Sequence, residues 1–176
     1  FSVGGALKAQ QENGFSMMRP PGHHAGEDFL GGFCYFNNLA IAVQKSGLKT
    51  LIVDFDGHHG NGTQDIFYGR EDVTYVSLHR SYAFPGTGKR SRKNTINYSL
   101  EANCGDERYL EVLNEALEKA GREDYEQLAV SAGFDTHEND PMASLGLTTS
   151  AYREIGKMLA GLELPAFAVL EGGYIG

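Results

Sequence analysis

The sequence Leu51-Ile52-Val53-Asp54-Phe55-Asp56-Gly57-His58-His59-Gly60-Asn61-Gly62 passes directly from an apolar strand into charged and polar residues. Asp54, Asp56 and His58 stand two residues apart, so an extended backbone would place all three side chains on one face. Two carboxylates and an imidazole without a thiolate suit zinc, with iron, cobalt or manganese as substitutes, better than calcium or magnesium. The spacing predicts a metal site. The alternative is a surface loop with solvated acids and idle histidines.

Apolar strands alternate with helical segments on both sides of this stretch. Such alternation predicts an α/β fold, with a parallel sheet covered by helices on both faces. There is no internal repeat or inter-domain linker, so residues 1–176 are expected to form a single domain. The strands are expected at 15–18, 51–53, 73–78, 95–100, 128–132 and 166–170, and the helices at 2–12, 39–45, 63–67, 106–120 and 150–162.

Capping residues predict several helix ends. Asn37 or Asn38 is expected to cap the helix at 39–45, and Asp106 the helix at 106–120. Gly14 and Gly121 are expected to stop the first helix and the helix at 106–120.

The composition is that of an ordinary globular protein, with 41% hydrophobic and 22% charged residues. A net charge of −8 argues against non-specific nucleic-acid binding, because a phosphate backbone attracts lysine and arginine. The same charge is compatible with a basic peptide or a polyamine as substrate. The one concentrated basic segment, residues 89–93, is too short to form a binding groove.

The chain has only two cysteines, Cys34 and Cys104, which fits a reducing cytoplasm. No apolar run approaches the ~18 residues of a membrane span, and no signal peptide opens the chain. We therefore expect a cytoplasmic protein without a membrane partner, and the oligomeric state stays open. The chain starts at Phe1 without an initiator methionine and stops at Gly176, so we expect it to be part of a longer protein.

Four polar motifs each follow the expected end of a strand. They are His23-His24, the stretch 54–58, Asp135, and Gly172-Gly173-Tyr174. Ligands of open α/β sheets bind in the crevice at the carboxyl ends of the strands, so these motifs are expected to meet in one site.

The remaining catalytic groups come from these motifs. Asp135 is the natural third metal ligand, although the spacing leaves His137 as a competitor. His23 and His24 supply imidazoles with an ordinary pKa of ~6.5, suited to general base catalysis. Tyr174 follows two glycines and could donate a hydrogen bond to a developing oxyanion. Each of these residues also has a plain structural reading, as a loop or packing residue.

Six sequence blocks, in chain order, resemble the signature blocks of the zinc-dependent histone deacetylase family. This family includes acetylpolyamine amidohydrolases and acetoin-utilisation proteins. The blocks are RPPGHHA at 19–25, GFCYFNN at 32–38, DFDGHHGNGT at 54–63, FPGTG at 84–88, GFD at 133–135 and EGGY at 171–174.

The resemblance implies an arginase-like, three-layer α/β fold with the active site at the carboxyl ends of the strands. It implies a zinc-dependent amidohydrolase that removes acetyl groups from acetyl-lysine or acetylated polyamines by means of metal-activated water. By the same resemblance, the zinc ligands are Asp56, His58 and Asp135.

The resemblance also assigns roles around the metal. His24 matches the general base and acid, His23 its electrostatic neighbour, and Tyr174 the residue that stabilises the oxyanion. Asp54 matches a carboxylate that supports His23 beside a structural potassium ion. Ser77, Leu78 and the carbonyl groups of Asp56 and His58 match the other contacts of that ion.

A narrow substrate channel is implied as well. Phe33 and Phe84 match its walls, Gly32 gives it room, and Met142 is expected at its rim. The family domain extends beyond both ends of this chain, so its N-terminal and C-terminal portions are expected to be lacking here.

One position departs from the pattern of many members, and two other functions compete. Asn61 stands where many members have an aspartate behind the base, so His24 is expected to be less basic. An arginase-like ureohydrolase would need further carboxylates for two manganese ions, where this chain has Gly60 and His137. A truncated, non-catalytic module that binds acyl-lysine is the second alternative.

Overall fold

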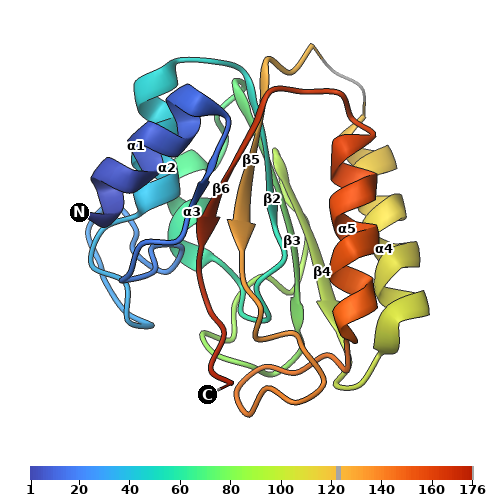
Figure 1. The fold of residues 1–176 in the computed structure, drawn as a ribbon. Helices are drawn as coiled ribbons and strands as arrows, with labels where there is room; N and C mark the ends of the chain where they lie inside the picture. The colour runs from blue at the N-terminus through green and yellow to red at the C-terminus, as the bar shows by residue number, and fades with distance from the viewer. Residues whose placement is uncertain (122–123, 176) are drawn as a thin grey trace.

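A single parallel sheet forms the centre of the protein, as Figure 1 shows. The computed structural model describes residues 1–121 and 124–175. The strand order is β1-β6-β5-β2-β3-β4, and every neighbouring pair is parallel. The strands are β1 (Phe15–Ser16), β2 (Thr50–Asp54), β3 (Val73–Arg80), β4 (Thr95–Leu100), β5 (Gln127–Ala132) and β6 (Ala166–Leu170).

Helices cover both faces of this sheet (Figure 1). One face carries α1 (Ser2–Glu12), α2 (Asn38–Ser46) and α3 (Asn61–Phe67), and the other carries α4 (Gly105–Ala120) and α5 (Thr149–Ala160). Each layer has its own apolar core, one with Tyr75 and Phe167 and the other with Tyr109 and Leu113. The predicted three-layer α/β architecture is confirmed.

The chain reverses its direction of travel across the sheet next to β2. From β2 it proceeds through β3 to β4, and it then returns to the opposite side of β2 with β5. The carboxyl ends of β2 and β5 therefore form a topological switch point, where open α/β sheets bind their ligands. The register pairs Asp54, the last residue of β2, with Ser77 on β3 and with Ser131 on β5, so these three buried polar residues lie side by side across the sheet.

Strand β1 is shorter than expected. It pairs with β6 only at Phe15 and Ser16, while Met17 and Met18, which were assigned to the strand, are exposed. Helix α5 also ends earlier than the range 150–162, at Ala160, and α3 begins two residues before the expected start, at Asn61.

Two of the predicted helix ends are wrong. Cys104, not Asp106, occupies the N-cap position of α4. The Asp106 carboxylate instead accepts hydrogen bonds from the backbone N–H and hydroxyl of Thr148, so it ties the start of α4 to the start of α5. Asn13, not Gly14, takes the left-handed conformation that ends α1, with φ of 53°.

Other ends follow the prediction. The Asn37 side chain accepts from the backbone N–H of Ala40 and caps α2, and Gly121 ends α4 with φ of 76°. None of the helices in the described part of the chain is long and apolar enough to cross a membrane.

Candidate active site

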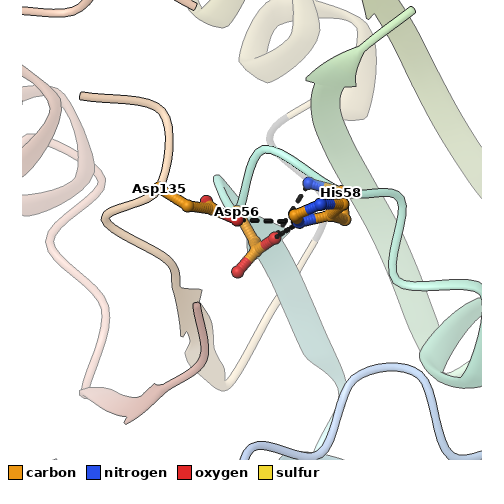
Figure 2. Close-up of side chains that lie close together, drawn as sticks. All are labelled: Asp56, His58 and Asp135. Atoms are coloured by element: carbon orange, nitrogen blue, oxygen red, sulfur yellow. Dashed lines mark hydrogen bonds and ion pairs between the residues drawn. The ribbon is translucent and has the colours of Figure 1, made fainter. Parts of the chain in front are cut away.

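Three candidate metal ligands meet at the switch point (Figure 2). Asp56 and His58 follow β2, and Asp135 follows β5. All three are buried, and their ligand atoms lie within 4.8 Å of one another. His58 Nδ1 lies 2.7 Å from Asp135 Oδ2 and 3.1 Å from Asp56 Oδ1. The parallel sheet thus brings together residues that are far apart in the sequence.

Backbone N–H groups hold the two carboxylates in place. Asp56 accepts from the N–H groups of His58 and Gly172, at 2.8 and 2.7 Å, and Asp135 Oδ1 accepts from that of Gly57 at 2.7 Å. The backbone approaches this closely because Gly57 and Gly172 have no Cβ. A Cβ at Gly172 would lie 2.6 Å from Asp56 Oδ2, and a Cβ at Gly57 would lie 2.6 Å from the Cβ of Ala143.

The ligand set fits a divalent cation. Burial lowers the pKa of His58, but hydrogen bonds and charges of Asp135 and Asp56 outweigh this effect and raise it to about 9. Burial and the charge of Asp56 raise the pKa of Asp135 to about 7. Asp135 Oδ2 is buried and lies 2.7 Å from His58 Nδ1, but this close ionic contact lacks the geometry of a well-aligned hydrogen bond. The raised pKa of His58 reflects the two carboxylates that face its Nδ1, and a cation bound among these three groups would release the imidazole proton.

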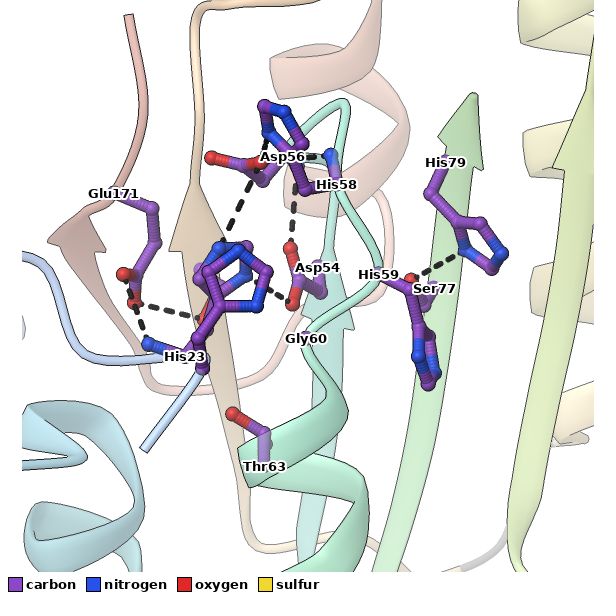
Figure 3. Close-up of polar contacts among 12 residues, drawn as sticks. His23, Asp54, Asp56, His58, His59, Gly60, Thr63, Ser77, His79 and Glu171 are labelled. Atoms are coloured by element: carbon purple, nitrogen blue, oxygen red, sulfur yellow. Dashed lines mark hydrogen bonds and ion pairs between the residues drawn. The ribbon is translucent and has the colours of Figure 1, made fainter. Parts of the chain in front are cut away.

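The expectation that Asp54, Asp56 and His58 project together from an extended strand is wrong. The strand ends at Asp54, and the following residues bend away from it. Asp54 turns to a different partner: His23 Nδ1 donates to Asp54 Oδ2 at 3.1 Å (Figure 3). Of the three residues, only Asp56 and His58 belong to the ligand cluster.

His23 lies between two carboxylates. Its Nδ1 contacts Asp54, and its Nε2 lies 3.7 Å from Asp56 Oδ1. Burial lowers the pKa of His23, but the charges of Asp56, Asp54 and Glu171 together raise it well above the ordinary value of 6.5. The ring is therefore a buried imidazolium that balances part of the carboxylate charge.

His24 is the neutral member of the pair. Its ring centroid lies 4.0 Å from that of His23 and 6.0 Å from that of His58. Burial and the charge of His23 lower its pKa to about 3, although a hydrogen bond to Asn61 opposes the shift. Because His24 Nδ1 donates to Asn61 Oδ1 at 2.8 Å, the Nε2 lone pair is the one left to accept a proton.

Two supporting residues were missed by sequence reasoning. Glu171, fully buried after β6, accepts from the backbone N–H groups of Gly22 and His23, at 2.7 and 3.1 Å, and so holds the histidine loop against the sheet (Figure 3). The Tyr75 hydroxyl donates to Asp54 Oδ2 at 2.9 Å. An acid at the end of an apolar strand is a signal that could have singled out Glu171. Tyr75 sits in a strand pattern typical of core residues and gives no such signal.

Aromatic side chains surround the open side of the cluster. The Phe84 ring meets the His24 ring edge-on at 5.0 Å, and the Phe33 ring lies 6.1 Å from that of Tyr174. Phe33, Phe84 and Met142 are 63%, 53% and 50% exposed, so their faces remain open to a ligand.

Gly32 makes room for the His24 ring. It has φ of +53°, and a Cβ there would lie 2.2 Å from the Cδ2 atom of His24.

The other predicted residues lie beside the cluster. Ser77 is buried in register with Asp54, and its hydroxyl lies 3.0 Å from His79 Nδ1 (Figure 3). Leu78 is fully buried in the core. His137, the competing third ligand, is not part of the ligand cluster, and its Nδ1 accepts from the backbone N–H of Asn139.

Comparisons with known proteins agree with this arrangement. Residues 2–175 match the histone deacetylase domain family. The chain is 41% identical to the acetylpolyamine amidohydrolase of Mycoplana ramosa, over 96% of this chain and 53% of that protein. It is 40% identical to a probable deacetylase of Archaeoglobus fulgidus, over 99% of this chain and 55% of that protein.

A solved structure has the same fold. The crystal structure of an acetylpolyamine aminohydrolase from Burkholderia pseudomallei superposes with a TM-score of 0.89 at 34% identity, over 98% of this chain and 55% of that chain. This likeness confirms the predicted arginase-like α/β fold. The chain spans about half the length of the curated relatives it matches.

Proposed function

The chain belongs to the histone deacetylase family, and from this premise we propose that it hydrolyses the amide bond of an acetylated amine to give the free amine and acetate. One observation carries the proposal: a cluster able to hold a metal lies beside a neutral imidazole with one free nitrogen. A substrate drawn from acetylated polyamines or acetyl-lysine peptides fits the names of the relatives, which include acetylpolyamine amidohydrolases.

In this proposal Asp56, His58 and Asp135 hold a zinc ion, for which Fe2+, Co2+ or Mn2+ could substitute. The donor set of two carboxylates and one imidazole supports a borderline divalent cation. When bound there, the metal supplies a Lewis acid that polarises the acetyl carbonyl and makes water more acidic.

His24 is proposed to move the proton. Its Nε2 accepts a proton as water attacks the carbonyl carbon, and it later returns that proton to the departing amine. Because Asn61 holds Nδ1, the ring keeps one orientation throughout both steps. The His23 imidazolium, 4.0 Å away, disfavours a lasting positive charge on His24 and so favours return of the proton.

Tyr174 is proposed to donate a hydrogen bond to the oxygen of the tetrahedral intermediate. A donor of this kind typically contributes about 10²- to 10³-fold to kcat. Phe33 and Phe84 are proposed as the walls that confine the acyl-amine stem, with Met142 at the rim.

A potassium ion beside Asp54 is a further part of the proposal. Ser77 would contribute its hydroxyl, and Leu78 its backbone carbonyl. The parallel register of β2 and β3, which sets Ser77 beside Asp54, supports this assignment. A reducing, cytoplasmic location is supported by the free thiols of Cys34 and Cys104.

The test measures turnover and metal content together. The purified chain, loaded with Zn2+, is assayed with a fluorogenic acetyl-lysine peptide and with N-acetylated putrescine. We expect about one zinc per chain, turnover of at least one substrate, and a loss of about 10²- to 10³-fold in kcat in Tyr174→Phe with zinc retained. Zinc bound at one per chain without turnover of either substrate would refute the proposal in favour of a non-catalytic binding module.

A further inference from the structure

The segment that carries Tyr174 is attached to the rest of the protein mainly at its start. Strand β6 ends at Leu170, and the segment 171–175 forms no strand. The N–H of Glu171 donates to the carbonyl of Ala132, and its carbonyl accepts from the Arg19 side chain. The N–H of Gly172 donates to Asp56, and its carbonyl accepts from the N–H of Phe134. The next attachment along the chain is the N–H of Tyr174 itself, which donates to Asp140 Oδ2 at 2.8 Å.

Asp140 divides its carboxylate between two loops. It is 5% exposed, and each oxygen accepts one backbone N–H at 2.8 Å: Oδ1 from Met142, and Oδ2 from Tyr174. The first bond closes a turn within its own loop, and the second reaches 34 residues along the chain. The same carboxylate therefore fixes the proposed rim residue and the proposed oxyanion donor.

The loop that carries Asp140 is firmly held and begins at a proposed metal ligand. Asp135 opens this loop, and the carbonyl of Thr136 accepts from the N–H groups of both Leu145 and Leu147. The Thr136 hydroxyl also lies 2.8 Å from that of Tyr152, on α5. Asp140 thus attaches Tyr174 to the same braced unit that carries Asp135.

We propose that Asp140 is a positioning residue, which holds the Tyr174 backbone at a fixed place relative to Asp135. Its effect on turnover rests on the proposed function, but the contact itself does not. The N–H groups of Met142 and Tyr174 point at the two terminal atoms of one side chain, so both of these atoms must be acceptors. A carboxylate meets this requirement, and an amide does not. In Asp140→Asn the amide NH2 would face one of these N–H groups, so one of the two hydrogen bonds must break.

Amide hydrogen exchange measures the contact directly. We expect the N–H of Tyr174 to be protected in the parent chain, and to exchange at least ~10-fold faster in Asp140→Ala, which removes both acceptors. In Asp140→Asn the N–H of either Tyr174 or Met142 should exchange faster, because one of the two loses its acceptor. Glu138→Gln is the matched control, because Glu138 is an exposed carboxylate of the same loop, and it should leave this exchange rate unchanged. An unprotected Tyr174 amide in the parent chain would overturn the proposal without any variant, even if the variants fail to fold.

A double-mutant cycle measures the consequence for catalysis. A misplacement of ~1 Å can cost on the order of 10²-fold in rate, so Asp140→Ala should lower kcat by up to about 10²-fold and change the zinc content little. In the Tyr174→Phe background the same substitution should cost much less, because the donor that it positions is already gone. Equal losses in both backgrounds would mean that Asp140 acts elsewhere and would overturn the proposal.

The two arms separate this inference from the proposed function. If the parent chain binds zinc and turns over no substrate, the proposed function fails, while the exchange measurement still decides the role of Asp140. If the parent chain is active and the Tyr174 amide exchanges equally fast in the parent and in Asp140→Ala, the positioning role fails alone.

Discussion

Replacement of Gly172 by alanine should damage the metal site by a single added methyl group. The Gly172 backbone passes so close to both candidate carboxylate ligands that a Cβ would lie 2.6 Å from Asp56 Oδ2 and 2.7 Å from Asp135 Oδ2. Gly172 does not adopt a left-handed conformation, so alanine is excluded by space and not by backbone strain.

The size of the effect follows from these distances. To reach an ordinary contact of 3.4 Å, Asp56 Oδ2 must retreat by roughly 0.8 Å and Asp135 Oδ2 by roughly 0.7 Å, whereas metal–ligand distances tolerate changes of only ~0.2 Å. A displaced ligand or supporting group typically costs about 10- to 100-fold in metal affinity. We therefore expect the Kd for Zn2+ to rise by at least ~10-fold, or about 1.4 kcal/mol in binding free energy.

A matched glycine provides the control. Gly156 lies within α5, and a Cβ there would meet nothing within 4 Å. Gly156→Ala should therefore raise the free energy of unfolding by about 0.5–1 kcal/mol and leave zinc affinity unchanged. Competition with a chromogenic chelator measures the affinity, and urea unfolding of metal-free protein measures the stability. Parental zinc affinity in Gly172→Ala would refute either the predicted clash or the assignment of the ligands.

Three further substitutions, with one control, test the stability of the fold. Burial and a neighbouring imidazole lower the pKa of His79 to about 3, so its contribution to stability is complete above the unfolded value of 6.5 and is lost as the pH falls towards 3. Urea unfolding should therefore show a shallower loss of stability on acidification in His79→Gln. The Asn94 amide donates to two backbone carbonyls and accepts from one N–H, so Asn94→Ala should lower the free energy of unfolding by about 1–3 kcal/mol. Exposed Asn114, replaced in the same way, should change it by less than about 0.5 kcal/mol. Tyr75→Phe removes the hydroxyl donor of a buried carboxylate and should cost about 1–3 kcal/mol by the same measurement.

The sequence predicted the sheet well because its strands are buried on both faces. Every residue of β2 and β5 is buried, so both strands stand out as short apolar runs between polar turns. Strand β1 lacks this protection at the edge of the sheet, and its predicted extension to Met18 failed. The prediction of the Asp106 cap failed for a different reason. The carboxylate accepts a hydrogen bond from Thr148, which is distant in the sequence and cannot be predicted from the local pattern.

The ligand cluster shows where local spacing stops being informative. Spacing alone placed Asp54 beside Asp56 and His58, but that inference assumed an extended backbone beyond the end of β2. Asp135 and His137 were indistinguishable as ligands by spacing. Asp135 lies nearer to the end of β5, and β5 is the neighbour of β2 in the sheet. This strand order could not be predicted from the sequence around either residue.

Charge balance explains why so many acids can be buried at one edge of the sheet. Asp54, Asp56, Asp135 and Glu171 are each at most 1% exposed, and a buried carboxylate without a partner would be very costly. His23 lies within reach of Asp54 and Asp56 and offsets part of their charge. Backbone N–H groups donate to at least one oxygen of Asp56, Asp135 and Glu171. When His58 serves as a neutral metal ligand, the His23 imidazolium alone cannot neutralise four carboxylates, so the remaining negative charge must be met by protons or by a cation. A divalent ion held by Asp56, His58 and Asp135 would balance this negative charge at the point where the carboxylates converge. Because the ion would bind only the folded state, tighter binding would stabilise that state more. The charges that make the site reactive would then also make the fold depend on the metal.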